Sequence, residues 1–240
     1  MRHSSKPLTD CDGRSCVPDN QAGPALVIFD WDGTLMDSTA RIVECLCAAA
    51  CDSQLPVLPA EQARSIIGLG LPEAIRQLYP DIDEAACRRM RDHYAARFIA
   101  AEASPCQLYP GVIEVLSTLR EQGTVMAVAT GKSRRGLDRV WASSGIGEFF
   151  IASRCADESR SKPHPAMLHQ LLAELSMSPQ QALMVGDTCF DVDMAHNAGM
   201  RSTALTWGAH SRQQLINSKP HYVIDDIAAL MSLAHNEEIA

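Results

Sequence analysis

The chain has 240 residues, of which 46% are hydrophobic and 21% are charged, a composition typical of a globular protein. It carries 21 lysines and arginines against 29 aspartates and glutamates, so its formal net charge is -8. A field of this sign repels polyanions, so neither nucleic acid nor an anionic membrane surface is an expected partner. No stretch reaches the about 18 apolar residues of a membrane span. Nine scattered cysteines without a Cys-x-x-Cys pair predict reduced thiols and a cytoplasmic location.

The chain begins with a polar segment and then shows one strand and a long helical stretch. Residues 1–23 lack periodicity and are predicted to form a disordered tail. The apolar run 25–29 ends in acidic and turn residues, which is typical of a fully buried strand. Residues 38–104 show only the helical spacing of apolar side chains. From residue 105 onward strands alternate with amphipathic helices, and the expected strands are 125–129, 149–152, 182–185, 202–206 and 222–224.

This alternation predicts an α/β fold. Strands separated by helices form right-handed βαβ units, which build a doubly wound parallel sheet covered on both faces. The predicted core comprises residues 24–37 and 105–240, and residues 38–104 form a helical insertion after the first strand. In such a sheet, ligands bind beyond the carboxyl ends of the strands, where the strand order reverses. The residues that follow each apolar run are therefore the candidate site.

Acidic and hydroxyl residues follow three of the expected strands. Asp30 and Asp32 follow the first strand, Thr130 and Gly131 the second, and Asp187 the fourth. Carboxylates clustered without histidine or cysteine are hard oxygen ligands that suit Mg²⁺. A bound Mg²⁺ would attract a phosphate and hold it against a nucleophile. The sequence therefore predicts phosphoryl transfer at this edge of the sheet.

The four acids have separate expected roles in phosphoryl transfer. Asp30 is placed to attack phosphorus and form an aspartyl phosphate. Asp32 would donate a proton to the leaving oxygen and then accept one from water. Asp187 would complete the metal shell, and Asp191, at the start of the next helix, would orient metal-bound water.

The phosphate itself needs donors that the cation does not supply. The Thr130 hydroxyl, the Gly131 N–H and the Lys162 ammonium are expected to hold its oxygens. The run 130–133 ends like a P-loop, but Met126 stands where the leading glycine is needed. A P-loop is therefore not expected, and Ser133 is predicted to cap the following helix.

These residues, in this order, resemble the four motifs of the haloacid dehalogenase superfamily of phosphatases. The resemblance spans about residues 25–225, and the helical insertion 38–104 is similar to the helical cap of this family. Within it, residues 67–74 resemble a stretch of phosphoglycolate-phosphatase-like members. The four matching segments are Asp30-Trp31-Asp32-Gly33-Thr34-Leu35, Thr130-Gly131-Lys132, Lys162-Pro163-His164-Pro165 and Gly186-Asp187-Thr188-Cys189-Phe190-Asp191.

The resemblance implies a Mg²⁺-dependent phosphatase that hydrolyses a small phosphomonoester through an aspartyl phosphate. It assigns Asp30 as nucleophile and Asp32 as acid and base. It further implies that Asp30 and Asp187 bind the metal through their carboxylates and Asp32 through its backbone carbonyl. The cap would close over the site and exclude water. Phosphoglycolate is the leading expected substrate, while sugar phosphates, nucleoside monophosphates and the oligomeric state stay open.

Related activities differ at identifiable positions. A dehalogenase would lack the acid at position 32, and a phosphonate hydrolase would need a cap lysine, which residues 38–104 do not contain. A β-phosphoglucomutase-like phosphotransferase keeps both acids but typically carries glutamate where this chain has Gly186. A non-enzymatic phospho-Asp signalling module is about half as long and has no cap. The last two remain the alternatives to a phosphatase.

Overall fold

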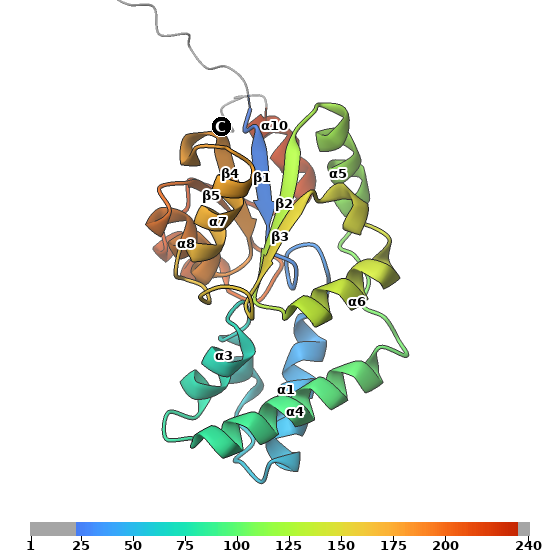
Figure 1. Cartoon of the computed structure of the whole chain (residues 1–240), viewed down its shortest axis with the longest axis vertical. Coiled ribbons are helices and arrows are strands. Elements are labelled where there is room, and N and C mark those ends of the chain that lie inside the picture. The colour runs from blue at the N-terminus through green and yellow to red at the C-terminus, as the bar shows by residue number, and fades with distance from the viewer. Residues whose placement is uncertain (1–22, 235–240) are drawn as a thin grey trace, which may run out of the picture.

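The computed structural model describes residues 23–234, and it confirms the predicted α/β fold. Six parallel strands form one sheet in the order β3-β2-β1-β4-β5-β6 (Figure 1). The chain leaves the central strand β1 toward one side and returns to β4 on the other, so the strand order reverses around β1. The strands are β1 Leu26–Phe29, β2 Val125–Thr130, β3 Ala152–Cys155, β4 Ala182–Gly186, β5 Arg201–Leu205 and β6 Tyr222–Ile224.

The central strand is buried on both faces because helices cover both faces of the sheet. Val27 and Phe29 point into one hydrophobic core, and Leu26 and Ile28 point into the other. The first core is completed by α5 (Val112–Glu121), α6 (Arg134–Ser144) and α10 (Leu230–Ala234), the second by α7 (Ala166–Glu174) and α8 (Cys189–Asn197). The remaining elements around the sheet are α9 Arg212–Asn217 and the 3-10 turns η1 Gly147–Phe149, η2 Pro179–Gln181 and η3 Ile227–Ala229.

Residues 38–104 fold into helices with a hydrophobic core of their own, including Leu46, Ile75 and Met90. This helical block lies beyond the carboxyl ends of the strands (Figure 1). The two linkers that join it to the sheet run side by side, since the Asp37 N–H donates to the Gln107 carbonyl at 2.9 Å. The helices are α1 Thr39–Asp52, α2 Ala60–Arg64, α3 Leu71–Leu78 and α4 Glu84–Ala101.

One predicted strand was misplaced. The apolar run 149–152 is not a strand: Phe149 ends η1, and the strand β3 begins only at Ala152. Phe149 and Phe150 fill the first hydrophobic core instead, where the Phe150 ring lies edge-on to Trp31 at 6.2 Å between centroids. Bonding to β2 starts after these rings, where the Ile151 N–H donates to the Met126 carbonyl at 3.0 Å. The predicted tail lies outside the described residues, apart from residue 23.

The helix cap predicted at Ser133 is confirmed. Ser133 caps α6, and its hydroxyl accepts a hydrogen bond from the Gly136 N–H at 3.2 Å. Gly123 follows α5 with a φ of 78°, a left-handed conformation that favours glycine. Among the described residues, no helix is long and apolar enough to cross a membrane.

Candidate active site

The strand topology brings the predicted site residues together at one edge of the sheet. Asp30 directly follows β1, Thr130 ends β2 and Asp187 directly follows β4. The Asp30 N–H donates to the Val185 carbonyl at 2.9 Å, which extends the pairing of β1 and β4 up to the site. Residues that lie up to 157 positions apart in the sequence therefore share one small volume.

Asp30 lies at the centre of this group and is 1% exposed. Its Oδ1 accepts hydrogen bonds from the Trp31 N–H at 2.7 Å and from Lys162 Nζ at 2.9 Å. Its Oδ2 is buried and has no hydrogen-bond partner among the described residues. Burial raises the pKa of Asp30 well above its usual range, although Lys162 opposes this shift. One carboxylate oxygen is thus held in place while the other is left for a ligand.

Lys162 links Asp30 to Asp191. Its fully buried ammonium donates to Asp191 Oδ1 at 2.7 Å as well as to Asp30. The other oxygen of Asp191 accepts from Thr188 N and Oγ1, at 3.1 and 2.7 Å, and so caps α8. Burial alone would lower the pKa of Lys162, but the two carboxylates hold it above its ordinary value. Lys162 therefore stays charged and retains one N–H for a further acceptor.

Asp187 is enclosed by backbone. Its Oδ1 accepts from Thr34 Oγ1 and its Oδ2 from the Ala209 N–H, both at 2.7 Å. A Cβ at Gly33 or Gly208 would lie 2.2 or 2.1 Å from Oδ2, so only glycine fits beside this carboxylate. Burial and the nearby Asp191 raise the pKa of Asp187 to about 7.

The buried acids form a candidate cation site. Carboxylate oxygens of Asp30, Asp187 and Asp191 lie within 4.8 Å of one another. Three buried carboxylates repel one another, which is part of the reason why the pKa values of Asp30 and Asp187 are raised. A set of three buried carboxylates offers only oxygen donors and fits Mg²⁺, which prefers carboxylate and water ligands. These residues could therefore hold the predicted metal.

Asp32 lies apart from this acidic cluster. Both of its oxygens accept from Lys132 Nζ at 2.9 Å, and Oδ1 also accepts from Ser38 Oγ at 2.6 Å. The Lys132 ammonium lies 4.8 Å from the centre of the Phe98 ring on α4, within the range of a cation–π contact. Lys132 stands in the second matching segment, but the sequence indicated no role for Lys132 or for Ser38. The only sequence signal for Lys132 was its place directly after Thr130 and Gly131.

Thr130 and Gly131 lie between the acids and the helical block. Thr130 is fully buried, and its Oγ1 accepts from the Lys132 N–H at 3.2 Å, so its own proton is left for another acceptor. A Cβ at Gly131 would lie 2.5 Å from the Leu69 carbonyl and 2.7 Å from the Gly68 carbonyl. The loop of the helical block therefore packs directly against the backbone of Gly131.

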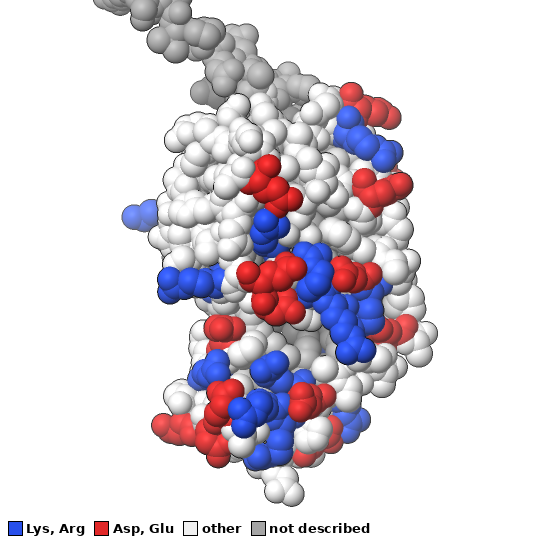
Figure 2. Space-filling model, viewed as in Figure 1, with Lys and Arg blue, Asp and Glu red and all other residues white. Residues whose placement is uncertain are grey.

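A cavity of about 340 Å³ opens from these residues into the helical block. The sheet contributes Asp30, Asp32, Thr130, Gly131 and Lys132 to its lining, whereas Asp187 and Lys162 lie behind the lining. Figure 2 shows acidic and basic side chains mixed over the helical block and the adjoining edge of the sheet domain on the face in view. That face has no continuous basic surface of the kind that binds nucleic acid.

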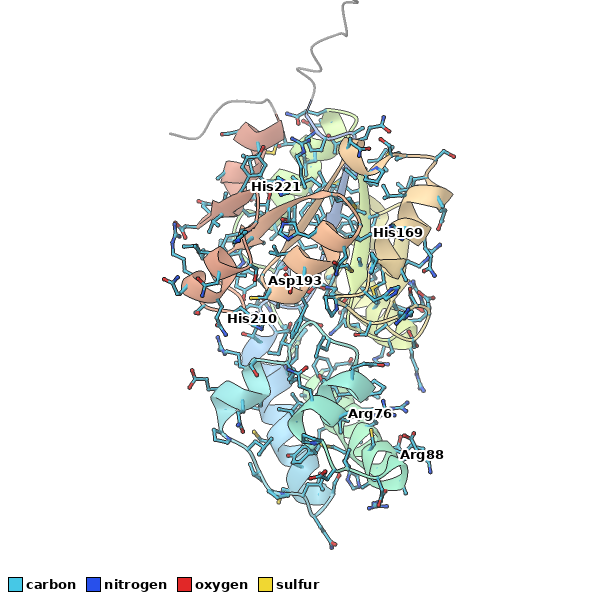
Figure 3. The ribbon with its side chains drawn as sticks, turned by 90° about the vertical axis from the view of Figure 1, so that its left-hand side faces the viewer. Arg76, Arg88, His169, Asp193, His210 and His221 are labelled. Carbon is cyan, nitrogen blue, oxygen red and sulfur yellow. The ribbon has the colours of Figure 1, made fainter. Side chains whose placement is uncertain are left out.

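His210 joins the sheet domain to the helical block (Figure 3). Its Nδ1 accepts from the Cys189 N–H at 3.0 Å, which requires an unprotonated Nδ1 and leaves Nε2–H to donate to the Ser65 carbonyl at 3.1 Å. His164, in the third matching segment, accepts from the Ala166 N–H at 3.2 Å. Sequence reasoning missed His210, because its partner Ser65 lies 145 positions earlier in the chain.

Comparison with known proteins agrees with this geometry. The model of the family described as "Haloacid dehalogenase-like hydrolase" matches residues 27–205, and the chain belongs to this family. Its fold and motifs confirm the resemblance seen in the sequence, and the chain is an enzyme of this hydrolase family whose named relatives are phosphatases.

The relatives cover nearly the whole chain. It is 34% identical over 214 residues to "Probable phosphatase IndB" of Dickeya dadantii, covering 88% of this chain and 93% of the relative. It is 32% identical over 217 residues to the phosphoglycolate phosphatase of Haemophilus influenzae, covering 87% and 97%. The crystal structure of a predicted phosphoglycolate phosphatase from Haemophilus somnus superposes with a TM-score of 0.76 at 28% identity, covering 87% of this chain and 97% of the other.

Proposed function

We propose that this protein is a Mg²⁺-dependent phosphatase that hydrolyses a small phosphomonoester through an aspartyl phosphate on Asp30. The observation that carries this proposal is the Oδ2 of Asp30, a buried oxygen without a partner among the described residues. The carboxylate bearing it also lines the cavity and belongs to the acidic cluster. A carboxylate oxygen in this position is available for attack on phosphorus.

The side chains around Asp30 supply the binding groups. The Thr130 hydroxyl, the Gly131 N–H and the remaining N–H of Lys162 would hold the phosphate oxygens. The carboxylates of Asp30 and Asp187 and the backbone carbonyl of Asp32 would hold Mg²⁺, with Asp191 beside them. When bound, Mg²⁺ neutralises negative charge on the phosphate and lowers its repulsion from the acids.

The reaction then has two steps. Asp30 Oδ2 forms a bond to phosphorus while the bond from phosphorus to the leaving oxygen breaks, and Asp32 donates its proton to that oxygen. Asp32, now a carboxylate, next takes a proton from water. The resulting hydroxide attacks phosphorus, releases inorganic phosphate and restores Asp30.

We further propose that residues 38–104 act as a cap on a core formed by residues 24–37 and 105–240. The backbone of Gly68 and Leu69 packs on Gly131, and the Gly70 N–H donates to Ser161 Oγ at 2.8 Å. These contacts cover the cavity from the side of the helical block. Such a cover would exclude bulk water from the aspartyl phosphate and would open for exchange of substrate and product.

Gly186 supports hydrolysis over transfer to a second substrate. A Cβ at this position would lie 2.3 Å from Cγ of Asp191, so a glutamate of the phosphoglucomutase type cannot fit without displacing Asp191. The names of several relatives make phosphoglycolate the reference substrate. Sugar phosphates and nucleoside monophosphates belong to the same class of phosphomonoester.

Phosphate release from a panel of these esters tests the proposal. We expect release that requires Mg²⁺, stops on addition of a chelator and continues far beyond one equivalent of phosphate per chain. The variant Asp30→Asn keeps the size of the side chain and should lose activity by several orders of magnitude while retaining the fold, checked by circular dichroism. Release limited to one equivalent would instead support a signalling module. Equal activity of wild type and Asp30→Asn would show that Asp30 is not the nucleophile.

A further inference from the structure

The cavity extends well beyond the space that a phosphate group occupies. Its volume of about 340 Å³ falls in the range of pockets that enclose drug-sized ligands, about 300–1,000 Å³. Its wall in the helical block is mainly apolar. Ile42 and Leu46 of α1, Ile66 and Ile67 of the loop before α3, and Leu71 at the start of α3 all line it. A two-carbon leaving group such as glycolate would leave much of this apolar wall uncovered.

One face of α4 forms another side of the cavity, next to the pair of Asp32 and Lys132. Arg91, Tyr94, Ala95 and Phe98 recur at helical spacing and all line the cavity. The rings of Tyr94 and Phe98 are 5.8 Å apart between centroids and tilted by 34°. The Tyr94 hydroxyl makes no hydrogen bond to any described residue and is not fully buried. Tyr94 therefore offers the cavity both an aromatic ring and a free hydroxyl.

The cations of the cavity are already paired or lie at its rim. Lys132 is bound to Asp32, and Arg139 donates to Glu102 at 2.9 Å. Arg91 is exposed. The inner part of the cavity thus has no free cation among the described lining residues to pair with the carboxylate of glycolate. Burying an anion without a partner is unfavourable.

We infer that the leaving group of the preferred substrate is an uncharged ring larger than glycolate, and that Tyr94 sets this preference by packing against the ring. The inference rests on the proposed phosphatase activity. A sugar and a nucleoside share the required chemistry, since each offers a ring with an apolar face and hydroxyls that can bond to Tyr94 Oη.

The test compares kcat/KM for four esters with Mg²⁺: ribose 5-phosphate, a ribonucleoside 5′-monophosphate, glycerol 3-phosphate and phosphoglycolate. We expect at least one ring ester to exceed both acyclic esters by about tenfold, the scale of one aromatic contact plus its burial. The variant Tyr94→Leu should reduce that advantage to about twofold and leave the acyclic esters little changed. Tyr79→Leu is the matched control, because Tyr79 lies in the same helical block and does not line the cavity.

The outcomes separate the inference from the function on which it rests. If kcat/KM for ribose 5-phosphate already exceeds that of the acyclic esters, the subsite binds the sugar. If only the nucleotide has the higher kcat/KM, the subsite binds the base. Phosphoglycolate as the best substrate, or a ring advantage that survives Tyr94→Leu, would overturn the inference while leaving the phosphatase intact. No release from any of the four esters, with Mg²⁺ bound, would overturn the proposed function itself.

Discussion

Asp30 and Asp32 are two residues apart, yet the structure gives them different surroundings. Asp30 is buried beside Lys162 and the acidic cluster, whereas Asp32 faces Lys132 and Ser38 at the edge of the cavity. The turn at Gly33, with a φ of 78°, follows Asp32 and carries the chain back toward the linkers. Two carboxylates with different partners can take different roles, one as nucleophile and one as acid and base.

This separation predicts how Asp32→Asn behaves. Phosphate release from alkyl esters should fall by about 10²- to 10⁴-fold, the usual contribution of general acid–base catalysis. With p-nitrophenyl phosphate the leaving group needs no proton, so stopped-flow absorbance should show a burst of about one equivalent of nitrophenolate followed by slow turnover. Asp37→Asn is the control, since Asp37 accepts from the Tyr109 hydroxyl on the linker. An equal loss with both kinds of ester and no burst would contradict the role of Asp32 as acid.

At the scale of elements, one loop after β5 serves both parts of the molecule. Ala209 donates to Asp187 of the acidic cluster, and the next residue, His210, donates to the Ser65 carbonyl between α2 and α3. The carbonyl of Gly208 also accepts from Arg64 at 3.5 Å. The position of the helical block is therefore coupled to the loop that holds Asp187.

We predict that His210→Ala loosens the helical block over the cavity. One lost hydrogen bond across the junction is worth about 0.5–1.5 kcal/mol. Steady-state kinetics should show KM raised about three- to tenfold, with a smaller change in kcat. His221→Ala is a matched control: His221 Nδ1 also accepts a backbone N–H, from Ser202, but on the side of the sheet domain away from the helical block (Figure 3). The same change in KM for both variants would mean that His210 acts only on stability.

For the whole molecule, the site opposes folding when no cation is bound. Asp187 and Asp30 lie in the interior with raised pKa values, so they bind protons more tightly when folded than when unfolded. A raised pKa of an acid stabilises the folded state at low pH, and this contribution is lost as the pH rises from about 4 to about 7. Lys162 stays protonated throughout this window, so it does not change the direction in which stability varies with pH.

Thermal unfolding with and without Mg²⁺ checks this expectation. The metal-free protein should lose Tm between pH 5 and pH 8, and Mg²⁺ should raise Tm more at pH 8, because protons compete for the same carboxylates at pH 5. Asp187→Asn should raise the metal-free Tm at pH 8 and remove most of the Mg²⁺ effect. Asp193→Asn, on the same helix as Asp191 but outside the cluster, is the control (Figure 3). A Mg²⁺ shift that is independent of pH would contradict the assignment of the cluster.

Local patterns were sufficient for five of the six strands and for the acids at their ends. The run before Asp30 is buried on both faces, and this burial requires continuous apolar residues that are visible in the sequence. The same reasoning failed for Phe149 and Phe150, because an apolar run does not show whether it pairs in a sheet or fills a core. Tertiary packing of aromatic rings decided that segment.

The sequence by itself determined the fold class and the order of the chemical groups, because strand periodicity and turn residues act over a few positions. Only the tertiary structure decided which partner each group has. Lys132 lies 100 positions from Asp32, and His210 lies 145 positions from the Ser65 carbonyl that it binds. The position of Tyr94 against the cavity likewise depends on how the helical block docks on the sheet. Such contacts arise from packing between separate elements, and no periodicity in the chain encodes them.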